Sequence, residues 1–147
     1  MTELLNAIVL WISINLAVPA VYDHPRIEYV PPAKMIAMRL RGMPTTAQAA
    51  LLPSQIPDVV AIYDDEKRTI FLPEGWTGKT PAELSVLVHE MVHHLQNVSG
   101  QKFECPAARE KPAYLAQDKW LKQFDQTLEQ DFEVDLFTIV VKSACII

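Results

Sequence analysis

Residues 80–100 read TPAELSVLVHEMVHHLQNVSG, and both ends of this stretch carry the signals of an amphipathic helix. Thr80 is suited to the N-cap, Pro81 to the first helical position, and Glu83 to a capping box in which it reaches back to the cap. Ser99 and Gly100 predict where the helix ends. Apolar residues recur along one predicted face, at Leu84, Leu87, Val88, Met91 and Leu95. The fold is therefore expected to be organised around this helix.

The middle of the helix contains an HExxH sequence, which runs from His89 to His93. Positions i and i+4 lie on one face of a helix, so both imidazoles can reach one metal ion at about 2.0 to 2.1 Å. Glu90 lies roughly 100° around the helix, beside the ion, where a carboxylate can take a proton from metal-bound water. The alternative is a polar stripe without metal. His94, at i+5, is expected to be a packing or surface histidine, and His24 a turn residue.

A zinc site needs a third protein ligand, with the fourth position left to water in a catalytic site. Glu110 is the preferred candidate, because Glu110, Ala113, Tyr114 and Gln117 form one helical stripe that would face the HExxH helix. Gln117 is expected to hydrogen-bond a ligand from the second shell. Tyr114 is either a core residue or a donor to a developing oxyanion. Glu110 could instead be a first-turn acid favoured by the helix dipole, which would leave Glu104 or Asp118 as the ligand.

The remaining elements are expected to be short. Residues 4–12 predict a helix of roughly three turns that covers a sheet, and residues 26–30 predict a strand. Residues 35–40 suit a strand or a helix. Residues 42–57 predict a surface excursion, with a helical turn through residues 47–52. Residues 59–63 and 69–72 are rich in β-branched and aromatic side chains on either side of a charged run, so they predict a hairpin.

Two further segments follow the HExxH helix. Residues 108–124 predict a helix with its stripe along Ala113, Gln117, Trp120 and Phe124; it either begins near Arg109 or is kinked at Pro112. Residues 128–147 predict a helix in which Phe132, Leu136 and Val140 share a face.

Composition and charge limit the number of domains and the kinds of partner that the chain can have. The chain has 147 residues, 50% hydrophobic and 21% charged, which fits a single globular domain over residues 1–147. A net charge of −5 disfavours nucleic acid as a partner. Residues 4–20 end in something like a small-residue cleavage site, but they lack a basic start and sit at the short limit for a bilayer span. We therefore expect a buried helix in preference to the alternative of a signal peptide, and no stable membrane insertion. The compartment stays open between cytoplasmic and periplasmic or secreted, because Cys105 and Cys145 suit either a disulfide or two thiols.

At His89 to His93 and Glu110 the chain resembles the gluzincin branch of the zincin metallopeptidases, in which a later helix supplies a glutamate ligand. It is also similar to small bacterial HExxH proteins of uncharacterised function with a downstream Glu-x-x-Ala-x-x-x-Gln pattern, which stands here at residues 110–117. The resemblance covers about residues 59–120. It implies that the strand at residues 69–72 is a sheet edge along which an extended peptide binds. The chain is too short for the second domain that completes the cleft of larger gluzincins.

These observations predict an α+β minimal zincin-like domain: a short twisted sheet with a hairpin, packed on the HExxH helix and closed by a Glu-bearing helix. The predicted function is zinc-dependent hydrolysis of a peptide or protein substrate. Zn²⁺ would be bound by His89, His93 and Glu110, with Glu90 as general base and then general acid. The alternatives are a non-catalytic zinc-binding regulatory or interaction module, and a metal-free structural domain. The sequence leaves the oligomeric state undetermined.

Overall fold

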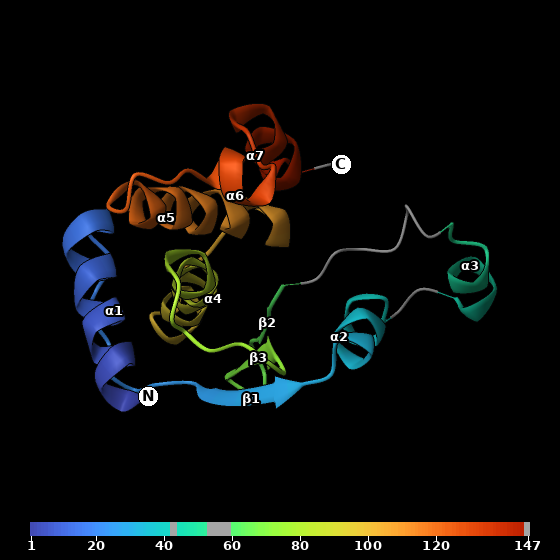
Figure 1. Ribbon diagram of the computed structural model, residues 1–147, viewed down its shortest axis with the longest axis horizontal. Helices are drawn as coiled ribbons and strands as arrows, with labels where there is room; N and C mark the ends of the chain where they lie inside the picture. The colour runs from blue at the N-terminus through green and yellow to red at the C-terminus, as the bar shows by residue number, and fades with distance from the viewer. Residues whose placement is uncertain (42–43, 53–59, 146–147) are drawn as a thin grey trace.

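The centre of the molecule is α4 (Pro81–Val98), which bears the HExxH sequence (Figure 1). The computed structural model describes residues 1–41, 44–52 and 60–145, and shows a mixed fold of helices with a small sheet. Every residue from Ser85 to Gln96 is buried, so α4 is covered on all sides and not along its apolar face alone. Its predicted start and end are both confirmed, and Ser99 is the C-cap.

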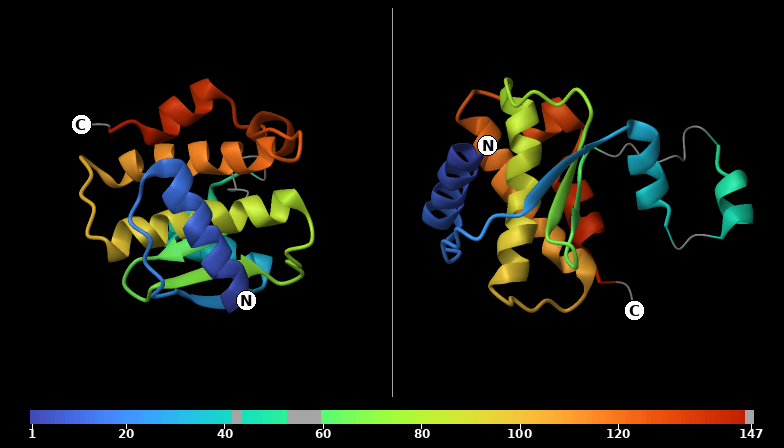
Figure 2. Two further views of the ribbon diagram at one scale, coloured as in Figure 1. Left: turned by 90° about the vertical axis from the view of Figure 1, so that its left-hand side faces the viewer. Right: turned by 90° about the horizontal axis from the view of Figure 1, so that it is seen from below.

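Two helices cover one side of α4. Helix α1 (Thr2–Leu16) buries Leu5, Ile8, Val9 and Ile12, and it packs on α4 and α5 (Glu110–Lys122). Figure 2 shows α1 crossing in front of these two helices. The expectation that this helix covers a sheet is met only in part: its main contacts are with α4 and α5, and its buried residues share one core cluster with Ile70 and Leu72 of the sheet. No helix among the described residues has both the length and the apolar character that a bilayer span requires.

The sheet has three strands in the order β1-β3-β2: β1 (Arg26–Val30), β3 (Thr69–Pro73) and β2 (Ile62–Asp64). β2 and β3 form the predicted antiparallel hairpin, and β1 pairs with β3 in parallel. The expectation that residues 69–72 form an edge strand is therefore wrong, because both sides of β3 are already hydrogen-bonded. Ile70 and Leu72 face the core around α4, while Phe71 packs with Val30 and Met35 on the other face.

Two helices, α2 (Pro32–Arg39) and α3 (Thr45–Ala49), follow β1 in the chain, and α3 lies away from the core (Figure 1). Residues 35–40, for which strand and helix were both open, lie mostly in α2 (Pro32–Arg39), which packs Met35 on the sheet. The predicted helical turn occurs slightly earlier, as α3 (Thr45–Ala49). Residues 42–43 and 53–59 of the expected excursion and hairpin lie outside the described residues.

The C-terminal third folds over α5. A short 3-10 helix, η2 (Pro106–Arg109), leads into α5. Pro112 therefore lies in the first turn of α5, which agrees with the alternative in which the helix begins near Arg109 and not with a kink at Pro112. The buried stripe of α5 differs from the prediction: Ala113, Ala116, Gln117 and Leu121 are buried, whereas Phe124 is exposed. The helix is therefore turned about its own axis, so that the face it buries differs from the predicted face.

The prediction of a single helix over residues 128–147 is also wrong. The chain forms α6 (Leu128–Phe132) and α7 (Leu136–Ser143), separated where Glu133 adopts a left-handed conformation with φ of 56°. Leu136 and Val140 are exposed, and Ile139 is buried in their place. A disulfide joins Cys105, before η2, to Cys145 after α7, which resolves the alternatives for the cysteines.

Candidate metal centre

The start of α4 is held in place by its cap and by the loop before it. The Thr80 hydroxyl accepts from the Glu83 backbone N–H at 3.1 Å, as expected. The Glu83 carboxylate reaches past the cap, and accepts from the backbone N–H groups of Thr77 and Gly78. Gly78 has φ of +68°, and a side chain there would meet the Trp76 ring. The loop and the first turn of α4 therefore form one unit.

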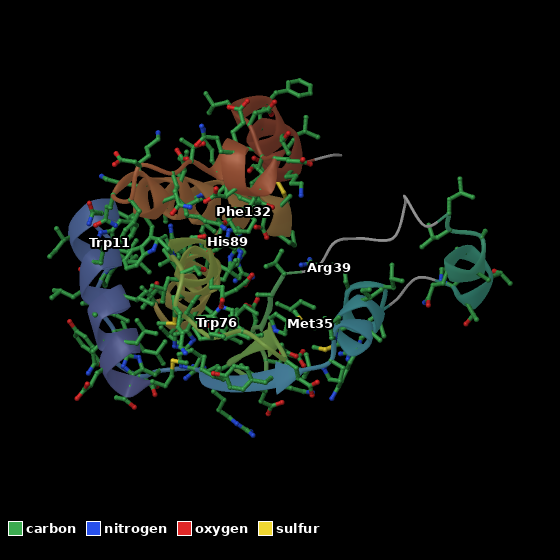
Figure 3. The ribbon with its side chains drawn as sticks, in the orientation of Figure 1. Trp11, Met35, Arg39, Trp76, His89 and Phe132 are labelled. Carbon is green, nitrogen blue, oxygen red and sulfur yellow. A yellow bond between two sulfur atoms is a disulfide. The ribbon has the colours of Figure 1, made fainter. Side chains whose placement is uncertain are left out.

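The three predicted ligands come together between α4 and α5. His89 Nε2 lies 3.1 Å from Glu110 Oε2, and His93 Nε2 lies 3.2 Å from Glu110 Oε1. One ligand atom from each residue lies within 4.8 Å of those of the other two, an arrangement that could hold a metal ion. Figure 3 shows His89 on the side of α4 that faces α5. The separation of α4 and α5 therefore sets the geometry of this group.

The orientation of the His89 ring is fixed by a chain of hydrogen bonds that ends on the backbone of α4. The Ser85 hydroxyl donates to the Ala82 carbonyl at 2.7 Å, so its oxygen is left to accept from Gln117 Nε2 at 3.2 Å. Gln117 Oε1 then faces His89 Nδ1 at 3.0 Å, and the ring nitrogen must be the donor. The network assigns the Nδ1–H tautomer, which leaves the Nε2 lone pair directed at Glu110.

A second chain fixes His93 in the same way, and it was not predicted. Gln96 Nε2 donates to the Arg109 carbonyl at 3.1 Å, so Gln96 Oε1 faces His93 Nδ1 at 3.0 Å. The Arg109 side chain also donates to Gln96 Oε1 at 3.4 Å. Gln96 lies three residues after His93 on α4, and this i, i+3 spacing is the only signal in the sequence that could have indicated it.

With both Nδ1 atoms acting as donors, three acceptor atoms meet at one point. Two imidazole lone pairs and a carboxylate repel one another unless a cation lies between them, either a metal ion or protons on the rings. Burial raises the pKa of Glu110, but the hydrogen bonds that His89 and His93 donate when they are protonated on Nε2 outweigh it and hold this pKa well below its ordinary value. Burial lowers the pKa of His93, yet Glu110 and Glu90 raise it overall. The site therefore requires positive charge.

Glu90 is a buried carboxylate beside this group. It is 7% exposed, and within the described part of the chain no hydrogen bond to its carboxylate is found. Its charge acts on both His93 and Tyr114, raising the pKa of each. The oxygens of this carboxylate are not among the fully enclosed unpartnered atoms of the described residues, and a carboxylate so placed beside a metal-ligand group is a candidate for proton transfer.

Tyr114 packs edge-on against the His89 ring, with 4.7 Å between ring centroids. Burial and the charges of Glu110 and Glu90 raise its pKa to about 12, whereas the charge of Arg39 acts in the opposite direction. Arg39 extends from the end of α2 (Figure 3). Tyr114 also packs beside the C-terminal cluster of Leu121, Leu128 and Ile139, so it is part of the core as well as a neighbour of the site.

The other candidate residues lie elsewhere. His94 is buried and packed, with Nε2 2.6 Å from the Asp23 carbonyl and Nδ1 2.9 Å from the Tyr63 hydroxyl. Asp118 accepts from the backbone N–H of Leu128 at the start of α6. Glu104 is exposed. Neither acid belongs to the metal-ligand group.

The sequence was compared with family models, with curated proteins and with solved structures, and a family model matches it. The family described as Domain of unknown function (DUF6647) matches residues 1–147. No curated protein and no solved structure matches the chain.

Proposed function

We propose that the chain, which belongs to the DUF6647 family over residues 1–147, binds one zinc ion and hydrolyses peptide bonds. The observation that carries the proposal is the convergence of His89, His93 and Glu110, with both ring tautomers fixed, next to the unpartnered carboxylate of Glu90. Together these residues offer a metal-ligand set and a base.

The distances support a tetrahedral ion. With bonds of about 2.0 to 2.1 Å, neighbouring tetrahedral ligand atoms lie about 3.3 Å apart. The Nε2 atoms of His89 and His93 lie 3.1 and 3.3 Å from the same oxygen, Glu110 Oε2, which is close to that spacing. Two histidines and one carboxylate also suit Fe(II), so a metal analysis should measure both elements. The neighbouring base favours zinc and hydrolysis.

Each residue would have a separate task. Zinc supplies a Lewis acid that lowers the pKa of bound water to about 7 and polarises the scissile carbonyl. Glu90 would accept the proton of the attacking water and deliver it to the leaving amine. The Tyr114 hydroxyl, whose high pKa keeps it protonated, would donate a hydrogen bond to the developing oxyanion. In the sheet formed by the described residues β3 is central, so an extended peptide would join it at β1 or β2.

A non-catalytic zinc-binding module is the second candidate. A hollow of about 460 Å³ lies between the end of α1 and α5, and none of the residues of the metal centre line it. A smaller hollow of about 200 Å³ includes Gln96 and Arg109 but none of the three ligands. Neither of these two hollows lies at Glu90, and a module that only binds the metal needs no substrate hollow there.

The decisive comparison is between wild type and Glu90→Gln on a general peptide library. Glu90→Gln should retain metal and fold, because Glu90 is not a ligand, while hydrolysis falls by about 10²- to 10⁴-fold. Tyr114→Phe should retain metal and lower kcat more than it changes KM. A zinc-loaded wild type without turnover on the library, or equal rates for wild type and Glu90→Gln, would replace the enzyme proposal with the binding module.

A further inference from the structure

Arg109 connects three elements that meet at the metal centre. Its guanidinium forms a two-pronged pair with Asp65, in the turn after β2, at 2.5 and 2.9 Å. The same side chain donates to Gln96 Oε1 and, through Nη2, to the His93 carbonyl at 3.4 Å. Its own carbonyl accepts from Gln96, and its backbone continues directly into Glu110. No other residue described in the site joins the hairpin, α4 and the start of α5.

Through these contacts Arg109 acts on two of the three proposed ligands, His93 and Glu110. Arg109 holds the ring of His93 through Gln96 and the backbone of His93 directly, while Glu110 is its neighbour in the chain. A displacement of Arg109 would therefore rotate His93 and shift Glu110 at the same time. The planar guanidinium, with donors directed to a carboxylate, an amide and a carbonyl, can make all three contacts, whereas a lysine ammonium cannot.

We propose that Arg109, held by Asp65, is a positioning residue that sets the separation of His93 from Glu110 and so determines metal affinity. The inference rests on the proposed function, because it needs the metal. It extends the site from the ligands to the β2–β3 turn. The side chain of Arg109 is 22% exposed and that of Asp65 45%, so their pair would add little to stability as a surface salt bridge.

The test measures Zn²⁺ affinity by competition with a chromophoric chelator, and ligand geometry from the visible spectrum of the Co²⁺-loaded protein. Arg109→Gln should lower affinity by about 10- to 100-fold, the range found for residues that orient metal ligands. Asp65→Asn should lower it less. Arg26→Gln is the matched control, because it removes an arginine from an exposed ion pair with Glu28 and should leave affinity unchanged.

A double variant separates positioning from general loosening of the fold. If Arg109 acts through Gln96, then Arg109→Gln with Gln96→Leu should cost less affinity than the product of the two single losses. The Co²⁺ spectrum should change in Arg109→Gln and stay unchanged in Arg26→Gln. Affinity in Arg109→Gln within twofold of wild type, or independent losses in the double variant, would overturn the proposal.

Arg109→Lys covers the case in which Arg109→Gln fails to fold, because it keeps the positive charge and the aliphatic stem. Reduced affinity with a changed Co²⁺ spectrum in this variant supports positioning, whereas wild-type affinity overturns it. A wild type without zinc affinity would remove the proposed function together with this inference. A zinc-binding wild type whose affinity is insensitive to Arg109 would remove this inference alone.

Discussion

At the scale of single residues, the arrangement of hydrogen-bond donors is more informative than the ligands themselves. His89 and His93 each donate from Nδ1 to a glutamine oxygen, and each glutamine is oriented by a further hydrogen bond. Both Nε2 atoms are thereby directed at the Glu110 carboxylate before any ion arrives. Such preorganisation is what outer-shell residues supply to metal ligands, and it distinguishes this group from a polar stripe on a helix.

Glu110→Ala tests the third ligand. It should lose most of the bound metal, as His93→Ala should, because two protein ligands rarely hold zinc tightly. Glu104→Ala is the matched control, since this acid is exposed and lies outside the group, and it should keep full metal. The measurement is the metal content of each variant after gel filtration has removed unbound metal. Full zinc in Glu110→Ala would show that another acid completes the site.

Sequence reasoning identified the three residues that the structure brings together as possible ligands, but only part of what orients them. His89, His93, Glu110 and Gln117 could be predicted from helical spacing, which depends only on local geometry. Arg109 could not, because its contacts with Asp65 depend on how the hairpin packs against η2, 44 residues away in the chain. Long-range packing of this kind has no periodic pattern in the sequence.

At the scale of elements, α4 owes its position to a loop that its own first turn binds. The Glu83 carboxylate accepts from the backbone of Thr77 and Gly78, and the Trp76 indole N–H donates to the Glu83 carbonyl at 3.0 Å. The capping-box expectation was therefore only half confirmed, since the carboxylate passes beyond Thr80. The HExxH turn lies two turns further along the same rigid helix.

The pH dependence of stability tests this contact. The hydrogen bond from the Thr77 backbone is the largest influence on Glu83, and it contributes to a pKa below the ordinary 4.5. A lowered folded pKa means that the carboxylate stabilises the fold fully above about pH 4.5, and that this contribution is lost as the pH falls through the folded pKa. The Tm of Glu83→Gln should therefore lie below that of wild type at neutral pH, and the two should converge in acid. A difference that does not change with pH would contradict the account, and Glu66→Gln, in an exposed turn, is the control.

The elements that were predicted wrongly share a cause. The resemblance implied that β3 is an edge strand, yet β1 pairs with it across a separation of 43 residues between Arg26 and Thr69. The tail breaks at Glu133 because α7 folds back on α5 and η2, whereas the sequence shows only a continuous apolar pattern. In both cases tertiary packing decided between structures that local propensity allowed.

At the scale of the whole molecule, the disulfide ties the two ends of the C-terminal third together. Cys105 lies just before η2 and Cys145 just after α7, so the bond fixes the segment that leads into Arg109 and Glu110. The candidate metal centre thus depends on a part of the chain that is closed covalently. Stable disulfides are typical of oxidising compartments, and we propose that the protein works in one.

Removing the bond should destabilise the fold. The cysteines are 40 residues apart in sequence, and closing a loop of that length stabilises a protein by about 2–4 kcal/mol. The variant with both Cys105→Ser and Cys145→Ser should show this loss in the free energy of unfolding measured with urea. Thiol titration of denatured, unreduced wild type should find no free thiol, and two reactive thiols would contradict the bond.

The central claim is that His89, His93 and Glu110 form a metal site, and metal content tests it most directly. Wild-type protein purified without chelator should contain about one zinc per chain by elemental analysis, and His93→Ala, prepared in parallel, should contain almost none. If the protein contains iron in place of zinc, the three residues still form a metal site, but the proposed zinc-dependent hydrolysis is replaced by another reaction. Wild-type protein that stays metal-free after incubation with Zn²⁺ and removal of unbound metal would contradict the account.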